Sequence, residues 1–301
     1  MILVDYSQTV IASFFAEAGG PASVGNDIDL TRHLVLNTLR SYNHKYKNSF
    51  GQLIVCADGQ NSWRKEVFPH YKAGRSKSRK AQKDVDWKAL FDALSQIFDE
   101  IRDLNLYPTI RVPHAEGDDV IATLTKWSFK EKGTSEKTLI VSSDKDFIQL
   151  QKYGNVSQFS PTKKGLLKDE KSPTDFLIEH IIKGDSSDGC PNIFSDDDVF
   201  VNDAKRQSPA TKKKVDAFMD FVYNGGDGEA KATALPPEEW RRNYDRNKRL
   251  IDLDMIPKEI EEKIVAQWDE VRDVPPSQKA FMDYLVQHRL KLLLGSIDEF
   301  F

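Results

Sequence analysis

Three short apolar runs, each followed by an aspartate, constrain the fold of this 301-residue chain more than any other feature. They are residues 2–4 before Asp5, residues 53–57 before Asp58 and residues 139–143 before Asp144. Short runs rich in β-branched residues are typical of buried strands in a parallel sheet. The carboxyl ends of such strands meet at one edge of the sheet, where ligands bind in open α/β folds. The sequence therefore predicts three aspartates gathered at one edge.

Amphipathic segments lie between these runs. Apolar residues recur at helical spacing over residues 30–46 and 87–104, and a fourth strand over residues 107–112 leads into a helix over residues 116–131. Strands that alternate with helices in this way are typical of a doubly wound α/β domain with a mainly parallel sheet. We expect such a domain over residues 1–180.

The remainder of the chain is predicted to be helical. Helical patterns occur over residues 174–183, 212–223, 237–249, 258–268 and 279–294. These segments predict a helical C-terminal domain over residues 181–301. The mean hydropathy of −0.54 and the lack of a long apolar run in the sequence argue against a transmembrane span, so no membrane partner is expected.

Cysteine content and charge narrow the class of protein further. Cys56 and Cys190, the two cysteines, lack the spacing of metal ligands, so we expect a reduced, cytoplasmic setting. The net charge of −4 is unusual for a protein that binds nucleic acid, but residues 63–83 hold eight basic residues against one acid, and residues 204–215 hold five basic residues. Such runs fit contacts with phosphate groups. Taken alone, they fit solvated faces equally well.

Further acidic residues accompany the strand-end aspartates. They are Glu116, Asp118 and Asp119 at the start of a predicted helix, Asp146 near Asp144, and Asp185 and Asp188 after another helix. Any one of them fits a helix cap or a turn. Together they predict a crevice of like charges, which requires a cation or bound protons. Oxygen ligands suit Mg²⁺ or Mn²⁺ rather than zinc, and two ions about 4 Å apart can activate a water and stabilise the leaving oxygen of a phosphodiester.

Five motifs in this chain resemble those of the flap endonuclease and 5′-nuclease superfamily. In order they are VDYS (4–7), CADG (56–59), EGDD (116–119), SSDKDF (142–147) and KGDSSD (183–188). The stretch WRKEVFPHYKAGRSK (63–77) resembles the segment that leads into the helical arch of this superfamily. The length, the LIDLDMIP stretch (250–257) and the IDEFF ending are similar to the ribonucleases H of T-even-type bacteriophages. The resemblance covers essentially the whole chain.

The resemblance implies a role for each acidic residue. Asp5, Asp58, Glu116, Asp118 and Asp144 match the first metal site of the superfamily, and Asp146, Asp185 and Asp188 match the second. Asp119 matches an acid with a less direct contact, and a helix cap explains it equally well. The implied cofactor is a pair of Mg²⁺ ions, for which Mn²⁺ can substitute. Lys72 and Arg75 match the catalytic cations that hold the scissile phosphate.

The resemblance also implies which residues bind nucleic acid. The contacts are expected from Arg64 and Tyr71, from Lys77, Arg79 and Lys80 in an arch over about residues 70–90, and from Lys212, Lys213 and Lys214. Tyr71 and Trp63 are candidates for stacking on a base, and core packing behind the arch explains Trp63 at least as well. Residues 183–214 take the place of the helix–turn–helix element that grips duplex DNA. This chain departs there, because Cys190, Pro191 and the acids of residues 196–198 replace a glycine-rich turn.

The implied function is that of a metal-dependent 5′-3′ exonuclease and flap endonuclease. Its substrates are DNA and RNA–DNA hybrids with 5′ ends or flaps, and its task is removal of RNA primers during phage lagging-strand replication. A PIN-type ribonuclease is an alternative, although such domains are about half this length. A catalytically inactive, structure-specific nucleic-acid-binding protein is another, although every expected acid is present. A phosphatase lacks support because Ser7 stands where a second aspartate is usual.

The last residues suggest a protein partner. Ile297, Phe300 and Phe301 resemble a peptide that docks on a sliding clamp, although Leu294 replaces the usual glutamine. The two phenylalanines either bind such a partner or fold back, since burying each stabilises by about 1.5–3 kcal/mol. A phage replication nuclease is expected to be a monomer in the host cytoplasm that works with a clamp or a single-strand DNA-binding protein.

Overall fold

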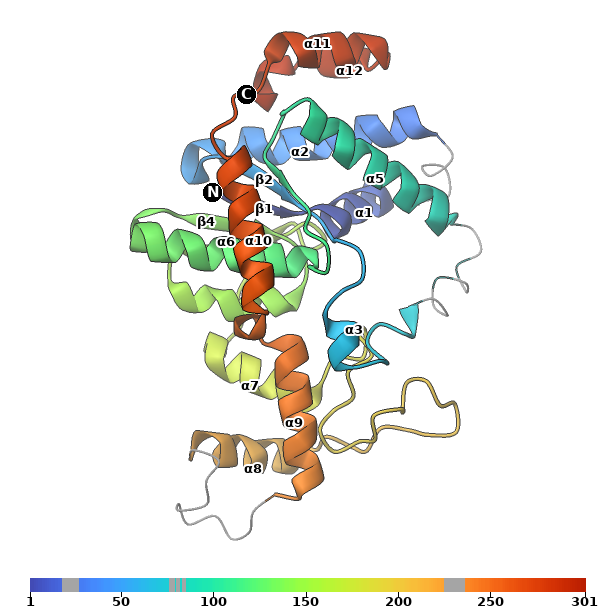
Figure 1. The fold of residues 1–301 in the computed structure, drawn as a ribbon, viewed down its shortest axis with the longest axis vertical. Coiled ribbons are helices and arrows are strands. Elements are labelled where there is room, and N and C mark those ends of the chain that lie inside the picture. Colours follow the sequence, from blue (N-terminus) through green and yellow to red (C-terminus); the bar gives the residue numbers. More distant parts are fainter. Residues whose placement is uncertain (18–26, 76–78, 80–81, 83–84, 225–235) are drawn as a thin grey trace. The chain divides into compact units, whose positions relative to one another are not determined.

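The computed structural model describes residues 1–17, 27–75, 79, 82, 85–224 and 236–301, shown in Figure 1. They form two compact units, each discontinuous in sequence. The first comprises Met1–Gln60, Gln82–Lys168 and Lys258–Phe301, and the second comprises Asn61–Ala81 and Asp169–Pro257. The predicted division into domains over residues 1–180 and 181–301 stays a prediction.

A six-stranded sheet in the order β3-β2-β1-β4-β5-β6 forms the centre of the first unit. The strands are β1 (Ile2–Asp5), β2 (Leu53–Cys56), β3 (Thr109–Ile110), β4 (Thr138–Val141), β5 (Val156–Ser160) and β6 (Gly165–Leu167). Neighbouring strands are parallel except β5 and β6, which are antiparallel. The predicted mainly parallel, doubly wound sheet is confirmed. The order reverses between β1 and β4, so their carboxyl ends lie at the switch point where such folds bind ligands.

Helices cover both faces of this sheet. On one face lie α1 (Tyr6–Glu17), α2 (Ile28–Phe50) and α5 (Trp87–Asp103), and they share a core cluster with Ile2 and Val4 of β1. Side chains alternate along a strand, so Leu3 points to the other face. There α6 (Gly117–Lys132) contacts β1 and β2, and α10 (Lys258–Val271) packs against α6 and β3 (Figure 1).

The last segment of the chain, Lys258–Phe301, is part of the first unit. The helix predicted over residues 279–294 is wrong in its extent, because the chain forms α11 (Gln278–Gln287) and then α12 (Lys291–Leu294). Arg289 between them has a φ of 55°, which a continuous helix cannot contain. Phe300 in η5 (Ile297–Phe300) is 2% exposed, and its ring centroid lies 4.7 Å from that of Phe281. Of the two expectations for the terminal phenylalanines, the packing of Phe300 supports the fold-back.

Several elements of the first unit escaped the sequence analysis. They are α1, β5, β6 and the 3₁₀ helices η2 (Gly133–Ser135) and η3 (Lys145–Tyr153). Helix α1 begins at the residue after β1, so a turn signal between the two is missing from the sequence. Strand β5 reads VSQFS, and its polar residues hide it from a search for apolar runs even though Gln158 and Ser160 are buried.

The second unit is helical. It contains α3 (Arg64–Val67), α7 (Pro173–Lys183), α8 (Lys212–Tyr223), α9 (Glu238–Ile251) and the 3₁₀ helix η4 (Leu253–Met255). Helices α7, α8 and α9 lie where the sequence predicted helices, whereas α3 was not predicted. One apolar cluster joins Phe68 and Tyr71 to Ile181, Leu250 and Ile251. It attaches residues 63–75, the described start of the basic run that is called the basic segment below, to α7 and α9. In the part of the chain that the structure describes, every helix is too short or too polar to cross a membrane.

Candidate metal and phosphate sites

Carboxylates of the first unit stand at the ends of adjacent strands. Asp5 is the last residue of β1, Asp58 follows β2 by two positions, and Asp144 follows β4 as the N-cap of η3. Glu116 is the N-cap of α6, which the chain enters after β3. Because β2, β1 and β4 are neighbours in parallel register, the three strand-end aspartates share the carboxyl edge of the sheet.

Two neutral donors hold the carboxylates of Asp5 and Asp58. The Ser142 hydroxyl donates to Asp5 Oδ2 at 2.8 Å and accepts from the backbone N–H of Asp144 at 3.1 Å. The backbone N–H of Gly117 donates to Asp58 Oδ1 at 2.8 Å. These bonds connect the end of β1 to the end of β4, and the end of β2 to the start of α6. The carboxylates are thus positioned by the scaffold itself.

A glycine makes the approach of β2 to α6 possible. Gly59 follows Asp58, and its backbone N–H donates to the Ala115 carbonyl at 2.8 Å. A Cβ at Gly59 would lie 1.9 Å from the Val112 carbonyl oxygen, so a side chain cannot be accommodated without moving backbone. The Asp-Gly pair of the CADG motif therefore combines a carboxylate with the close contact that brings it beside Glu116.

Asp118 and Asp119 differ in their surroundings. Asp119 is fully buried, and its Oδ2 accepts the backbone N–H of Glu116 at 2.9 Å. That bond caps α6, so the capping explanation of Asp119 is supported. Asp118 is half-buried, and its Oδ1 accepts the backbone N–H of Asp119. Asp118 lies in the first turn of α6, and its place in the first metal site stays a prediction.

The candidate metal ligands at this edge of the sheet are carboxylate oxygens, and the nearby Cys56 thiol is not among them. Burial first, and the nearby Asp5 carboxylate second, raise the pKa of the Cys56 thiol well above its ordinary value. The thiol therefore stays protonated, and a protonated thiol is a poor metal ligand. The carboxylates that remain suit Mg²⁺ or Mn²⁺.

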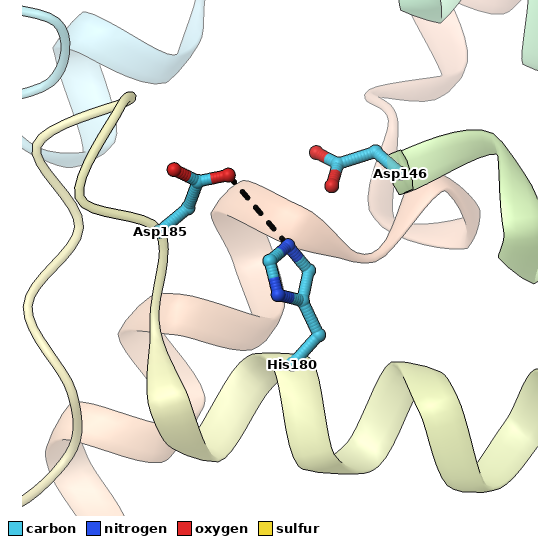
Figure 2. A group of neighbouring side chains, drawn as sticks. All are labelled: Asp146, His180 and Asp185. Atoms are coloured by element: carbon cyan, nitrogen blue, oxygen red, sulfur yellow. Dashed lines mark ion pairs between the residues drawn. The ribbon is translucent and has the colours of Figure 1, made fainter. Parts of the chain in front are cut away.

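In the second unit, Asp185 and Asp188 lie in a turn after α7. Asp185 Oδ1 accepts from the backbone N–H and the hydroxyl of Ser187, both at 2.7 Å. Its Oδ2 lies 3.7 Å from Nε2 of His180, an ion pair drawn in Figure 2. Figure 2 also draws Asp146, which belongs to the first unit and whose backbone N–H donates to Asp144 Oδ1. The sequence analysis missed His180, whose only signal is its position one turn before the end of α7.

The predicted catalytic cations surround Asp188. Arg75 Nη2 lies 2.5 Å from Asp188 Oδ1, and Lys72 Nζ lies 3.7 Å from Oδ2. The Tyr71 hydroxyl donates to the same Oδ2 at 2.9 Å, and the Lys72 ammonium lies 4.8 Å from the centre of the Tyr71 ring. Tyr71 is 2% exposed, which argues against the expected base stacking. The Asp188 carboxylate is thus the partner of both cations that are expected to hold the scissile phosphate.

Backbone contacts fix this arrangement. The Lys72 N–H donates to the Asp188 carbonyl at 2.7 Å, and Lys72 has a φ of 56°, an uncommon value for a residue with a side chain. Gly189 has a φ of 72°, and a Cβ there would lie 2.9 Å from the His70 carbonyl oxygen. The basic segment and the turn after α7 are therefore in direct contact, and a strained lysine sits at the point of contact, as is common in functional sites.

The other residues expected to bind nucleic acid are dispersed. Arg64 is 1% exposed and donates through Nε to the Leu250 carbonyl at 2.8 Å, with its guanidinium over the Trp63 ring. This position argues against a contact of Arg64 with the phosphate backbone, and Trp63 is buried as well. Arg79 is exposed, whereas Lys77 and Lys80 lie outside the described residues.

The start of α8 carries the predicted duplex-binding lysines. Lys212 and Lys213 are exposed, and Lys212 forms an ion pair with Asp216 at 3.0 Å. The Lys214 ammonium lies 5.3 Å from the ring centre of Phe194 and 5.8 Å from that of Trp240. The acids of residues 196–198 are paired within the unit, through Lys205, Arg242 and Arg246. Their negative charge near α8 is therefore largely compensated.

Comparison with known proteins places the chain in a class of nucleases. Residues 1–176 match the family of the 5′-3′ exonuclease, N-terminal resolvase-like domain, and residues 172–300 match the T4 RNase H C-terminal family. The chain therefore belongs to the 5′-3′ exonuclease family. It is 31% identical to the ribonuclease H of Enterobacteria phage T4 over 304 residues, which cover 99% of this chain and 95% of that protein. The resemblance inferred from the five motifs is confirmed.

More distant relatives agree with this assignment. A 5′-3′ exonuclease of Buchnera aphidicola (subsp. Schizaphis graminum) is 26% identical over 64% of this chain and 65% of its own length. A structure of the flap endonuclease of bacteriophage T5, in a complex with DNA and metal ions, superimposes with a TM-score of 0.66 at 17% identity, covering 91% of this chain and 99% of that one. At that identity the superposition shows a shared fold.

Proposed function

We propose that this protein is a divalent-metal-dependent 5′-3′ exonuclease and flap endonuclease. The observation that carries the proposal is the carboxyl edge of the sheet. There Asp5 and Asp58 are held by the Ser142 hydroxyl and the Gly117 N–H, and Glu116 and Asp144 are the N-caps of the helices that follow β3 and β4. Membership of the 5′-3′ exonuclease family supports the same reaction. The phage relatives, a ribonuclease H and a flap endonuclease seen with DNA, support RNA–DNA hybrids and 5′ flaps as substrates.

The proposed cofactor is a pair of Mg²⁺ ions, with Mn²⁺ as a substitute. Asp5, Asp58, Glu116, Asp118 and Asp144 would hold one ion, and Asp146, Asp185 and Asp188 would hold the other. Bound divalent ions activate a water and stabilise the leaving oxygen of a phosphodiester. The donor set fits, because all of these groups are carboxylates and the buried Cys56 is kept as a thiol.

Lys72 and Arg75 are proposed to bind the scissile phosphate. Asp188 holds both cations in place, and a phosphate can take over their hydrogen bonds because it also offers acceptor oxygens. Cations beside the reacting phosphate stabilise charge that develops in the transition state. Arg79 with Lys77 and Lys80 in the arch, and Lys212, Lys213 and Lys214 at the start of α8, are proposed to contact the phosphate backbone.

The biological role follows from the same relatives. We propose that the enzyme removes RNA primers during phage lagging-strand replication, with chemistry in residues 1–180 and duplex binding in residues 181–301. A clamp that bound Ile297, Phe300 and Phe301 would have to extract Phe300 from its contact with Phe281. A truncation after Glu299 distinguishes docking on a clamp from packing within the first unit. Loss of clamp stimulation at an unchanged Tm indicates docking. A lower Tm with intact stimulation indicates packing.

Cleavage of 5′-labelled flap, nicked and RNA-primed duplexes, with and without Mg²⁺, tests the proposal. We expect short 5′ products from all three duplexes in Mg²⁺ and intact substrates in EDTA. Products that persist in EDTA contradict the proposed metal dependence. Tight binding without cleavage at any Mg²⁺ or Mn²⁺ concentration supports the alternative of an inactive, structure-specific binding protein.

A further inference from the structure

The loop that carries Asp144 is attached on two sides. Toward β1, the Ser142 hydroxyl donates to Asp5, and the backbone N–H of Ser143 donates to Gln8 Oε1 at 3.1 Å. Toward β5, the hydroxyl of Ser143 is 2.8 Å from that of Ser160, and Gln158 donates to the loop. The loop between β4 and η3 therefore depends on side chains of a strand that carries none of the proposed metal ligands.

Gln158 makes the most direct of these contacts. Its Nε2 donates to the carbonyl of Ser142 at 3.0 Å and to the carbonyl of Asp144 at 2.5 Å, so one amide group joins both ends of the Ser142–Asp144 turn. The side chain is 1% exposed. It lies in β5 opposite Ile140 of β4, two positions before Ser142. A two-pronged donor in this place fixes the backbone from which the Asp144 carboxylate projects.

The amide oxygen of Gln158 shows that packing alone does not explain a glutamine at this position. Its Oε1 is buried without a hydrogen-bond partner among the described residues. A buried acceptor that has lost its water destabilises the folded state, and a leucine or methionine of similar volume would avoid that cost. A glutamine can make the two hydrogen bonds from Nε2 to the loop, and an apolar residue cannot.

We propose that Gln158 is a positioning residue for the metal site at the carboxyl edge of the sheet. It acts through the Ser142 and Asp144 carbonyls, and with the Ser142 hydroxyl it sets the separation of the Asp5 and Asp144 carboxylates before a metal binds. This inference rests on the proposed metal-dependent function. Groups that orient the ligands of a metal commonly change its affinity by about 10–100-fold when they are removed.

Metal binding by the full-length variant Gln158→Leu tests this role. We expect its Tm without metal to stay close to that of the wild type, because the lost bonds are offset by removal of the buried acceptor. The dissociation constant for Mn²⁺, measured by electron paramagnetic resonance without substrate, should rise about 10–100-fold. The Mg²⁺ concentration for half-maximal flap cleavage should rise in parallel, and high Mg²⁺ should restore most of kcat.

Gln151→Leu is the matched control. Gln151 also donates its amide to a backbone carbonyl in the first unit, that of Leu167 in β6 at 3.1 Å, but the Asp144 loop is not involved. Its metal affinity should equal that of the wild type. Gln158→Met preserves side-chain length and replaces Gln158→Leu if the latter unfolds.

Three outcomes are distinguishable. Wild-type Mn²⁺ affinity in a folded Gln158→Leu or Gln158→Met variant overturns the positioning role. An equal loss of Mn²⁺ affinity in Gln151→Leu overturns it too, because the effect then reflects general loosening of the unit. A wild-type protein that binds no Mn²⁺ and cleaves no substrate refutes the proposed function instead.

Discussion

The two units hold their proposed metal ligands in different ways. At the carboxyl edge of the sheet, the bonds that fix Asp5 and Asp58 come from a hydroxyl and a backbone N–H. In the second unit, Asp188 lies among a phenol, an ammonium and a guanidinium, from Tyr71, Lys72 and Arg75. Neutral donors orient a carboxylate and leave its charge in place, whereas cations neutralise it. A metal that binds Asp188 must therefore share this carboxylate with Lys72 and Arg75, which are also proposed to bind the scissile phosphate.

The largest effect is expected at the carboxyl edge. Asp144→Asn should slow flap cleavage on the order of 10³-fold, because several kcal/mol of stabilisation by the metal is lost at about 1.4 kcal/mol per tenfold. Single-turnover rates at saturating enzyme measure the loss, and flap binding should stay intact. The control is Asp92→Asn, which removes an exposed acid of α5 paired with Lys88. A cleavage rate near that of the wild type would show that Asp144 holds no essential metal.

A second experiment concerns the cations around Asp188. Lys72→Ala should lower the single-turnover rate about 10²-fold with a smaller effect on binding, since a cation beside the scissile phosphate acts mainly in the transition state. Lys171→Ala, which removes a lysine paired with Glu179 in the same unit, serves as the control. If binding falls as much as the rate, Lys72 is a general phosphate contact and the assignment fails.

The comparison itself is tested by Asp188→Asn and Asp5→Asn in metal-free protein. Asp188→Asn leaves Lys72 and Arg75 with one anionic partner fewer, so each can make a fuller contact with phosphate. The slope of log K against log salt for flap binding should steepen by up to about 0.9 per added contact. Asp5→Asn should change the slope less. Equal slopes in the two variants would remove the distinction between the two carboxylates.

The smallest effect is expected at Glu100, a carboxylate outside the proposed sites that is paired with Arg32 and contributes to stability. Burial by itself would raise the pKa of Glu100, but hydrogen bonds from Arg32, Tyr284 and Gln96 together outweigh it and lower the pKa to about 2. A lowered pKa stabilises the fold above the unfolded value of about 4.3, and this contribution is lost as pH falls toward 2. Glu100→Gln should therefore melt below the wild type at pH 7.

Melting curves between pH 7 and pH 2 check this expectation. The Tm difference between Glu100→Gln and the wild type should shrink as pH drops below about 4. Glu262→Gln, which removes an exposed helical ion pair, is the control and should change little at any pH. A Tm difference that does not vary with pH would mean that Glu100 contributes by packing and not by its charge.

The sequence predicted those features that follow from the periodicity of apolar residues, namely the strands and the aspartates at their ends. Asp5, Asp58 and Asp144 follow apolar runs, and the rule that parallel strands end at one edge was enough to bring them together. Arg64 shows what periodicity cannot encode: its partner is the Leu250 carbonyl, 186 positions away, and a basic residue in a basic segment reads as a surface contact. Gln158 was missed for a related reason, because a buried glutamine in a short strand gives no sign of the loop that it holds.

The attachment of Arg64 to Leu250 has a consequence for how the protein is made. The basic segment is synthesised early, but its buried guanidinium finds its acceptor only when the end of α9 has been translated, 186 residues later. At about 5–20 residues per second that delay is roughly 10–40 s. Lys72 and Arg75 can contact Asp188 earlier, so the Arg64 bond is the last of these attachments to form. The first unit also depends on late segments, because it includes Lys258–Phe301, so both units need residues that are translated after α9 begins.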